Sequence, residues 1–218
     1  MGAINLDNTT RKRGNMRSAV ILAGGKSSRM KKDKGMSTLA GKPLVQHVIE
    51  SIRSTVDEIV VVVGSENQVT NYKSVVEDDA RVVSDINDTI SPLVGALTGF
   101  REAQGEYVLL TGCDMPFINR EAVEYLFQSA GGHHGATYQW PNGWVEPLLA
   151  VYHLESSLAL AQKQYNQGEM RLRMLLLNLG NVKMIPMEQL KKIDPDLDTF
   201  YNANTEEQLA KAEKMLRK

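Results

Sequence analysis

Three features are nearly absent from this sequence, and each absence narrows what the chain can be. Cys113 is the only cysteine, so no intramolecular disulfide can form and nothing indicates an oxidising compartment. No apolar run approaches the length of a membrane span, and residues 60–63 and 175–177 are typical of a protein core. The formal net charge of -1 disfavours bulk electrostatic binding of nucleic acid. We therefore expect a cytoplasmic protein that binds neither membranes nor nucleic acid.

The rest of the composition is that of a globular protein. Of the 218 residues, 42% are hydrophobic and 23% are charged, which is enough apolar material for a substantial core. Residues 1–15 are polar and lack the apolar segment of a signal peptide, so we expect a disordered leader, with Met16 as an alternative start. Residues 16–218 show no linker or repeat, and we expect them to form a single domain.

Strand and helix patterns alternate over the first 130 residues. Continuous or short apolar runs predict buried strands at residues 18–23, 58–63, 81–84 and 106–111. Apolar residues at helical spacing predict helices that open at Pro43, that run through residues 93–100, and that follow a cap at Asn119. Repeated units of this size predict an α/β fold with a mostly parallel central sheet and helices on both faces.

The pattern changes after Gly131. Residues 136–140 and 144–152 look extended and flank a Pro-Asn-Gly turn, which predicts a β-hairpin inserted into the parallel sheet. Helices are expected at residues 156–165 and 171–179, and a strand at 182–185. Thr205 then opens a terminal helix with a capping-box pattern.

The loop after the first strand has the composition of a phosphate-binding loop. Gly24 and Gly25 allow backbone N–H groups to approach a phosphate without obstruction by a Cβ atom. Arg29 offers a planar guanidinium and Lys34 a compact charge for phosphate oxygens. The loop matches neither GxGxxG nor GxxxxGK followed by Ser or Thr, so a solvated surface loop is an equally good interpretation of this segment alone.

Two acids follow later strands. Asp114 lies in Gly-Cys-Asp-Met-Pro directly after the strand at 106–111, and Asp85 follows the strand at 81–84. A carboxylate at such a position can bind Mg²⁺ together with substrate phosphates. The alternative role, an aspartate in a turn or helix start, is weakened because Pro116 and Asn119 already provide for the next helix. Several acids at the edge that carries the glycine loop favour a functional site.

Read together, these motifs resemble those of the molybdenum cofactor guanylyltransferases, which are nucleotidyltransferases of the GT-A, Rossmann-like kind. The segments that carry the resemblance are LAGGKSSRM, KDKG, GKPL, ISPLVGAL, TGCDMPF, EPLLAVY and FYNANTEEQL, in the family's order. They cover nearly everything after Met16. The resemblance implies a three-layer α/β/α nucleotidyltransferase fold. Many members have Gly where this chain has Ser91, and residues 64–67 replace a segment that often carries a small polar residue.

The resemblance implies transfer of GMP from GTP to the terminal phosphate of molybdopterin, with release of pyrophosphate and with Mg²⁺ as cofactor. Molybdoenzymes or other cofactor-biosynthesis proteins are the further partners that it suggests. By the same resemblance, the catalytic residues would be Arg29, Lys34 and Asp114, of which Asp114 would bind the metal. The nucleotide would be contacted by Leu22, Ala23, Gly24, Gly25, Arg29, Lys34, Asp85 and Asp114. Asn202 and Asn204 match a late NxN element near the reaction centre.

The implied chemistry requires few special side chains. The attacking group is a phosphate oxygen that is already ionised at neutral pH, so catalysis rests on in-line positioning and on neutralising charge. Two rival functions stay open: cytidylyl or other nucleotidyl transfer to molybdopterin or another phosphorylated metabolite, and a non-catalytic nucleotide-binding partner of molybdoenzymes.

Several other residues suggest chemistry without establishing it. Cys113 adjoins Asp114, but a buried small apolar residue is the better interpretation, since this chemistry needs no thiol nucleophile. Trp140 and Trp144 are expected to pack across the hairpin, with stacking on a pterin as a second choice. Arg171 and Arg173 could receive the pterin phosphate, and a solvated helix face is an equally good interpretation of them.

Overall fold

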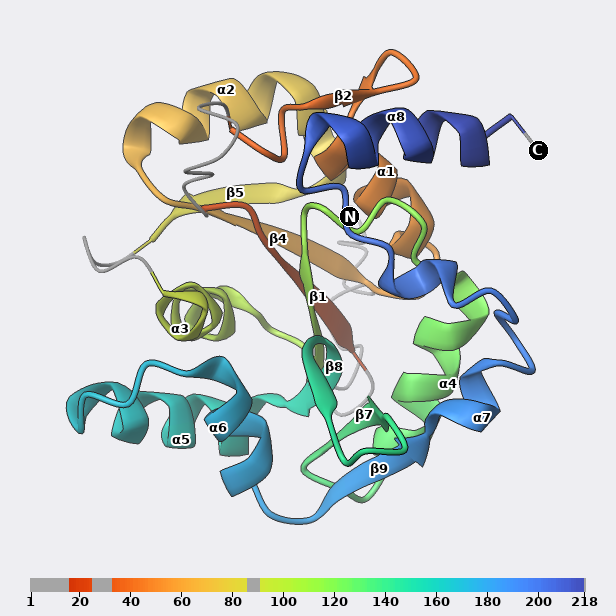
Figure 1. The fold of residues 1–218 in the computed structure, drawn as a ribbon. Helices are drawn as coiled ribbons and strands as arrows, with labels where there is room; N and C mark the ends of the chain where they lie inside the picture. Colours follow the sequence, from red (N-terminus) through yellow and green to blue (C-terminus); the bar gives the residue numbers. More distant parts are fainter. Residues whose placement is uncertain (1–15, 25–32, 86–90, 218) are drawn as a thin grey trace, which may run out of the picture.

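The computed structural model describes residues 16–24, 33–85 and 91–217 of the chain. At its centre lies a seven-stranded sheet in the order β5-β4-β1-β6-β8-β7-β9 (Figure 1). β8 runs antiparallel to both of its neighbours, and the other pairings are parallel. The strands are β1 (Arg17–Leu22), β4 (Glu58–Val63), β5 (Arg81–Ser84), β6 (Tyr107–Gly112), β7 (Gly135–Gln139), β8 (Val145–His153) and β9 (Val182–Pro186).

Two layers of helices cover the sheet (Figure 1). One face packs against α1 (Leu44–Ile52), α2 (Glu66–Val76), α4 (Arg120–Ala130) and α7 (Met187–Leu190). The other face packs against α3 (Pro92–Glu102), α5 (Leu154–Asn166) and α6 (Leu172–Asn178). Because both faces are covered, the four valines at 60–63 are all buried, which explains the unbroken apolar run in the sequence. The expected three-layer α/β/α fold with a mostly parallel sheet is confirmed.

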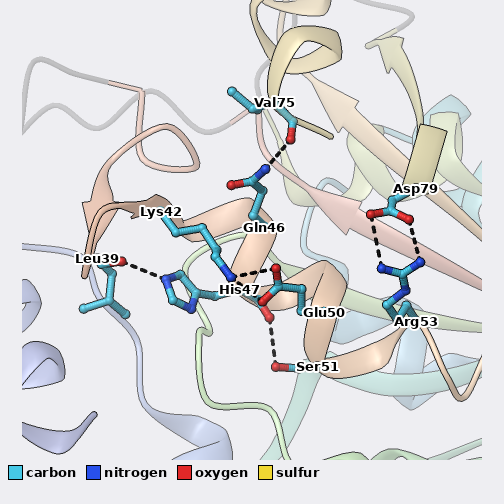
Figure 2. Close-up of polar contacts among 9 residues, drawn as sticks. All are labelled: Leu39, Lys42, Gln46, His47, Glu50, Ser51, Arg53, Val75 and Asp79. Atoms are coloured by element: carbon cyan, nitrogen blue, oxygen red, sulfur yellow. Dashed lines mark hydrogen bonds and ion pairs between the residues drawn. The ribbon is translucent and has the colours of Figure 1, made fainter. Parts of the chain in front are cut away.

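A small hairpin follows the Lys34 segment and is tied to α1. It consists of β2 (Thr38–Leu39) and β3 (Lys42–Pro43). His47 on α1 forms a hydrogen bond of 2.8 Å between its Nε2 and the carbonyl oxygen of Leu39, and Lys42 pairs with Glu50 at 2.6 Å (Figure 2). A third apolar cluster joins this hairpin to the segment around α8 (Glu206–Met215), and its buried members are Leu39, Leu44, Ala203 and Ala212.

Most local expectations match the observed elements within one or two residues. Asn119 caps α4 by accepting hydrogen bonds from the backbone N–H groups of Glu121 and Ala122, as expected. The inserted hairpin is β7 and β8, and its turn contains Gly143 with a positive φ of 80°. The sequence did not lead us to expect the β2–β3 hairpin, α2 or α7. α2 buries only Tyr72 and Val76, so its apolar pattern is weak.

No helix within the described ranges is both long enough and apolar enough to cross a membrane.

Candidate active site

The carboxyl ends of β1, β4, β5 and β6 meet at one edge of the sheet and line a cavity of about 230 Å³. In an open parallel sheet, ligands bind at this edge. The lining combines backbone at glycines with a few charged side chains, and its members include Leu22, Gly24, Gly64, Gly95, Gly112, Lys34, Asp85 and Asp114. This composition suits an anionic ligand that approaches the main chain closely.

Two of the glycines allow neighbouring strand ends to touch. A Cβ atom on Gly24 would lie 2.8 Å from the backbone nitrogen of Gly64, and one on Gly64 would lie 2.8 Å from the carbonyl oxygen of Gly24. Neither position accepts a larger residue without movement of the main chain. The two glycines therefore fix how closely the ends of β1 and β4 converge at the cavity.

A lysine, an aspartate and an asparagine side chain lie together at the carboxyl end of β6. Lys34 Nζ donates a hydrogen bond of 2.6 Å to Asn204 Oδ1 and lies 3.6 Å from Asp114 Oδ2. The backbone N–H of Ala203 donates to the carbonyl oxygen of Asp114 at 2.8 Å, which holds the late segment against the end of β6. The structure thus brings together Lys34, Asp114 and Asn204 from three distant parts of the chain.

The segment that carries Lys34 is anchored by its neighbour Asp33. The carboxylate of Asp33 accepts hydrogen bonds from the Tyr72 hydroxyl and from Gln68 Nε2, both on α2. Gln68 in turn accepts a hydrogen bond of 3.0 Å from the backbone N–H of Gly64. Burial raises the pKa of Tyr72 far above its ordinary value, and the negative charge of Asp33 adds to the shift, so the hydroxyl stays a neutral donor.

Asp85 lies at the end of β5 and lines the cavity. Its backbone N–H donates to the carbonyl oxygen of Val63 at 2.7 Å, which extends the pairing of β5 with β4 by one residue. The hydroxyl of Thr98 on α3 donates to Asp85 Oδ1 at 2.6 Å. These bonds orient a carboxylate at the cavity wall, where it can accept hydrogen bonds from a ligand.

Ser91 connects the cavity to the start of α6. Its hydroxyl oxygen accepts a hydrogen bond from the N–H of Leu93 and so caps α3. The same hydroxyl donates to the carbonyl oxygen of Met170 at 3.0 Å. A glycine at this position would provide neither bond, so the serine ties α3 to the segment that precedes α6.

Cys113 is a buried free thiol beside Asp114. Burial raises its pKa well above the ordinary value, and the negative charge of Asp114 raises it further. The group therefore stays protonated, which makes it a poor nucleophile. The interpretation of Cys113 as a small apolar residue of the core agrees with this environment.

The remaining expected residues are held by local contacts, lie outside the described residues, or line the cavity. Arg171 has a side chain that is 74% exposed, and it pairs with Glu169, whose pKa it lowers to about 2. Asn202 is exposed, and its side-chain amide donates to the carbonyl oxygen of Phe200 at 2.9 Å. Gly25 and Arg29 lie outside the described residues. Leu22 and Gly24 line the cavity, and Ala23 is buried between them in the chain.

The class of this protein follows from its similarity to a known protein family. Residues 19–182, which are most of the chain, match the model of the MobA-like NTP transferase domain. The chain belongs to this family. It is therefore a nucleotidyltransferase, and its cavity occupies the strand-end position at which α/β sheets bind ligands.

Relatives of this nucleotidyltransferase carry consistent names. It is 34% identical over 211 residues to a probable molybdenum cofactor guanylyltransferase of Natranaerobius thermophilus, covering 92% of this chain and 97% of that one. It is 31% identical over 199 residues to a protein of the same name from Methanosarcina acetivorans, with 88% of each chain covered. The family resemblance noted in the sequence is confirmed.

Solved structures share the fold of this nucleotidyltransferase. Molybdopterin-guanine dinucleotide biosynthesis protein A from Archaeoglobus fulgidus is 28% identical, with a TM-score of 0.78 and coverage of 93% of this chain and 99% of that one. A 4-diphosphocytidyl-2C-methyl-D-erythritol synthase from Anaerococcus prevotii is 15% identical, with a TM-score of 0.70 and coverage of 94% and 97%. The second likeness concerns the fold alone.

Three polar residues of the nucleotidyltransferase site were missed by sequence reasoning. Gln68 and Tyr72 hold Asp33, and Thr98 holds Asp85. Gln68 and Tyr72 are four residues apart, so they lie on one face of a helix. That spacing is informative only once a helix is expected there, and the weak apolar pattern of α2 gave no such expectation. Thr98 lies on an expected helix, but its partner became visible only in the fold.

Proposed function

We propose that this protein transfers GMP from GTP to the terminal phosphate of molybdopterin and releases pyrophosphate. The names of its relatives support the reaction, and the observation that carries it is the meeting of Lys34, Asp114 and Asn204 at a glycine-lined cavity. An acceptor phosphate oxygen forms the bond to the α-phosphorus of GTP. The bond from that phosphorus to the bridging oxygen breaks, and pyrophosphate leaves with the electron pair.

The side chains at the cavity suit this reaction without a general base. The second ionisation of a phosphate monoester has a pKa of about 6, so the attacking oxygen is already charged at neutral pH. Lys34 neutralises charge on the phosphates, and the hydrogen bond to Asn204 fixes where its ammonium group lies. The Gly24 backbone admits the triphosphate closely, and Asp85 accepts hydrogen bonds from the guanosine moiety.

The donor set around Asp114 fits Mg²⁺. The described residues include no group of three or more His, Cys, Asp or Glu side chains that could hold a metal by themselves. Mg²⁺ commonly binds through one or two carboxylates together with substrate phosphates, which is what Asp114 at a triphosphate cavity offers. When bound, the ion supplies positive charge at the α-phosphate and at the leaving pyrophosphate. Asp114 would hold the ion, and Lys34, whose Nζ lies 3.6 Å from Asp114 Oδ2, would add a second positive charge beside the phosphates.

Release of pyrophosphate tests the proposal directly. We would measure it with GTP, CTP, ATP and UTP in turn, each with and without molybdopterin and in saturating Mg²⁺. We expect release with GTP that depends on molybdopterin. Release with CTP alone would show that the reaction is cytidylyl transfer rather than guanylyl transfer. No release with any nucleotide would favour the alternative function, a nucleotide-binding partner of molybdoenzymes.

Replacement of the proposed metal ligand should separate catalysis from folding. We expect Asp114→Asn to lower kcat by at least about 100-fold, because a carboxylate that neutralises and positions charge is lost while the side-chain shape is kept. Asp79→Asn is the matched control, since Asp79 forms an exposed ion pair with Arg53 (Figure 2) and does not line the cavity. Near-normal turnover of Asp114→Asn would remove Asp114 from the mechanism.

A further inference from the structure

A cluster of four side chains surrounds the turn between β7 and β8. The indole N–H groups of Trp140 and Trp144 both donate to Glu146 Oε1, at 3.2 and 3.0 Å. The guanidinium carbon of Arg173, on α6, lies 4.2 Å from the centroid of the Trp144 ring. This is a cation–π contact, and it holds one ring against α6 while the other tryptophan packs elsewhere.

The two tryptophans differ in their surroundings. Trp140 is half-buried, and its ring centroid lies 5.7 Å from that of Phe200. Trp144 is 45% exposed although its position is fixed by Glu146 and Arg173. Packing within the fold explains why a tryptophan stands at position 140. It does not explain Trp144, a large aromatic ring that Glu146 and Arg173 hold in place but that stays open to solvent.

Arg173 fixes the Trp144 ring, and its own Nε is not open to a ligand. That nitrogen is buried and has no hydrogen-bond partner among the described residues. The guanidinium lies against the Trp144 ring and so covers part of it. The cluster therefore offers the open part of one aromatic ring, which Glu146 and Arg173 hold in place.

The cluster lies at the same sheet edge as the cavity. β8 runs antiparallel to β6, so β8 begins near the end of β6, and the turn before β8 lies toward the edge at which Asp114 follows β6. Leu148 on β8 lines the cavity. From the other side, the cavity residue Ser91 is bonded to Met170, three residues before Arg173. Two separate connections thus join the cluster to the cavity wall.

We propose that Trp144, positioned by Arg173, binds the planar ring of the acceptor substrate. This inference rests on the proposed function, in which the acceptor is a pterin that carries a phosphate. The pterin ring stacks on the open part of the Trp144 ring, which Arg173 fixes from one side. The attacking phosphate then points toward Lys34 and Asp114. In this arrangement the Trp144 ring binds the acceptor, and the strand-end cavity binds the nucleotide.

The two tryptophans allow a binding test that is independent of activity, because they are the only ones in the chain. Trp140→Phe leaves Trp144 as the single indole fluorophore, and Trp144→Phe leaves Trp140. We would titrate each variant with neopterin phosphate and follow the indole emission. We expect saturable quenching in Trp140→Phe and, beyond absorption by the pterin, none in Trp144→Phe. Equal quenching in both variants, or in neither, overturns the proposal.

Arg173→Met in the Trp140→Phe background removes the charge and donor but keeps the apolar stem. We expect it to weaken the binding of neopterin phosphate at least about tenfold, because the Trp144 ring loses the cation–π contact that holds it in place. The thermal midpoint and far-ultraviolet circular dichroism of each variant show whether it folds. Unchanged affinity in a folded Arg173→Met variant contradicts the assignment of Arg173.

Kinetics distinguish failure of this inference from failure of the proposed function. Trp144→Ala should raise the KM for molybdopterin at least about tenfold and leave the KM for GTP within twofold, since stacking acts on the acceptor alone. Trp140→Phe is the control and should change neither constant. If the wild type transfers GMP but Trp144→Ala keeps its acceptor KM, this inference alone is wrong. If Trp144 binds the pterin phosphate but the wild type transfers nothing, the proposed reaction is wrong and the ring site stands.

Discussion

At the scale of single residues, the site depends on side chains that touch no substrate in the proposed mechanism. Lys34 is held by Asn204, and the preceding residue Asp33 is held by Tyr72 and Gln68. The ammonium group of a lysine sits on a flexible stem, so its position must be fixed by neighbours. These contacts make Asp33 a positioning residue rather than a catalytic one.

Tyr72→Phe should reveal that positioning role. The substitution removes the hydroxyl that donates to Asp33, which should destabilise the fold by about 1 kcal/mol and lower kcat several-fold. Tyr138→Phe is the matched control, because its buried hydroxyl donates to the carbonyl oxygen of Ala122 and does not contact the Lys34 segment. We would compare thermal midpoints and kcat. A similar loss of stability in both variants, with lower kcat only in Tyr72→Phe, is the expected result, and equal kcat values would contradict it.

At the scale of elements, the strand ends decide where the site lies. Residues 58–63 and 81–84 were expected as strands from their apolar runs, and the structure has β4 and β5 at those bounds. Such runs are informative because strands buried on both faces carry few polar residues. The role of Asn204 was not accessible in the same way. Its contact with Lys34 spans 170 residues of sequence, and only the assembled fold brings the two together.

The late helix illustrates a partly correct local prediction. Thr205 caps α8 by accepting a hydrogen bond from the N–H of Gln208, as the capping-box pattern indicates. The return bond differs from the pattern, because Gln208 Oε1 accepts from the N–H of Asn204 rather than of Thr205. The cap therefore holds Asn204 as well as the helix. Sequence alone could give the motif but not this shift by one residue.

The contact between β1 and β4 gives a prediction at the same scale. Gly64→Ala would place a Cβ atom 2.8 Å from the carbonyl oxygen of Gly24, so the strand ends must separate. We expect a loss of about 1–3 kcal/mol, a lower thermal midpoint and weaker nucleotide binding.

Gly131→Ala serves as the control for that substitution. Its Cβ atom would meet the carbonyl oxygen of Gln128 at 3.6 Å, an ordinary contact, and it lies far along the chain from the cavity. We would measure the thermal midpoint and the affinity for GTP in both variants. If Gly64→Ala matched Gly131→Ala in both measurements, the close packing of the strand ends would contribute neither to stability nor to nucleotide binding.

At the scale of the whole molecule, we propose that residues 16–218 form one domain that is complete without the leader. Among the described residues, Met16 already contacts the sheet, because its carbonyl oxygen accepts a hydrogen bond of 2.9 Å from the N–H of Glu106. All of the proposed site residues lie after this point.

Removal of residues 1–15 tests the boundary. We expect a chain that starts at Met16 to keep its thermal midpoint within about 2 °C, a change that corresponds to less than about 1 kcal/mol for a chain of this size. Its kcat and KM for GTP should match those of the full chain. A marked loss of either stability or activity would show that the leader belongs to the domain.

The contact between Lys34 and Asn204 also bears on the order in which the protein becomes functional during synthesis. Every strand of the sheet has left the ribosome before Asn204 does, because β9 ends at Pro186. A nascent chain of that length contains the whole sheet but lacks the group that fixes its lysine. The arrangement around Lys34 can therefore form only after the segment that contains Asn204 has emerged. A chain released early would have the central sheet but would lack the hydrogen bond that positions Lys34, the cation that we propose to act on the phosphates.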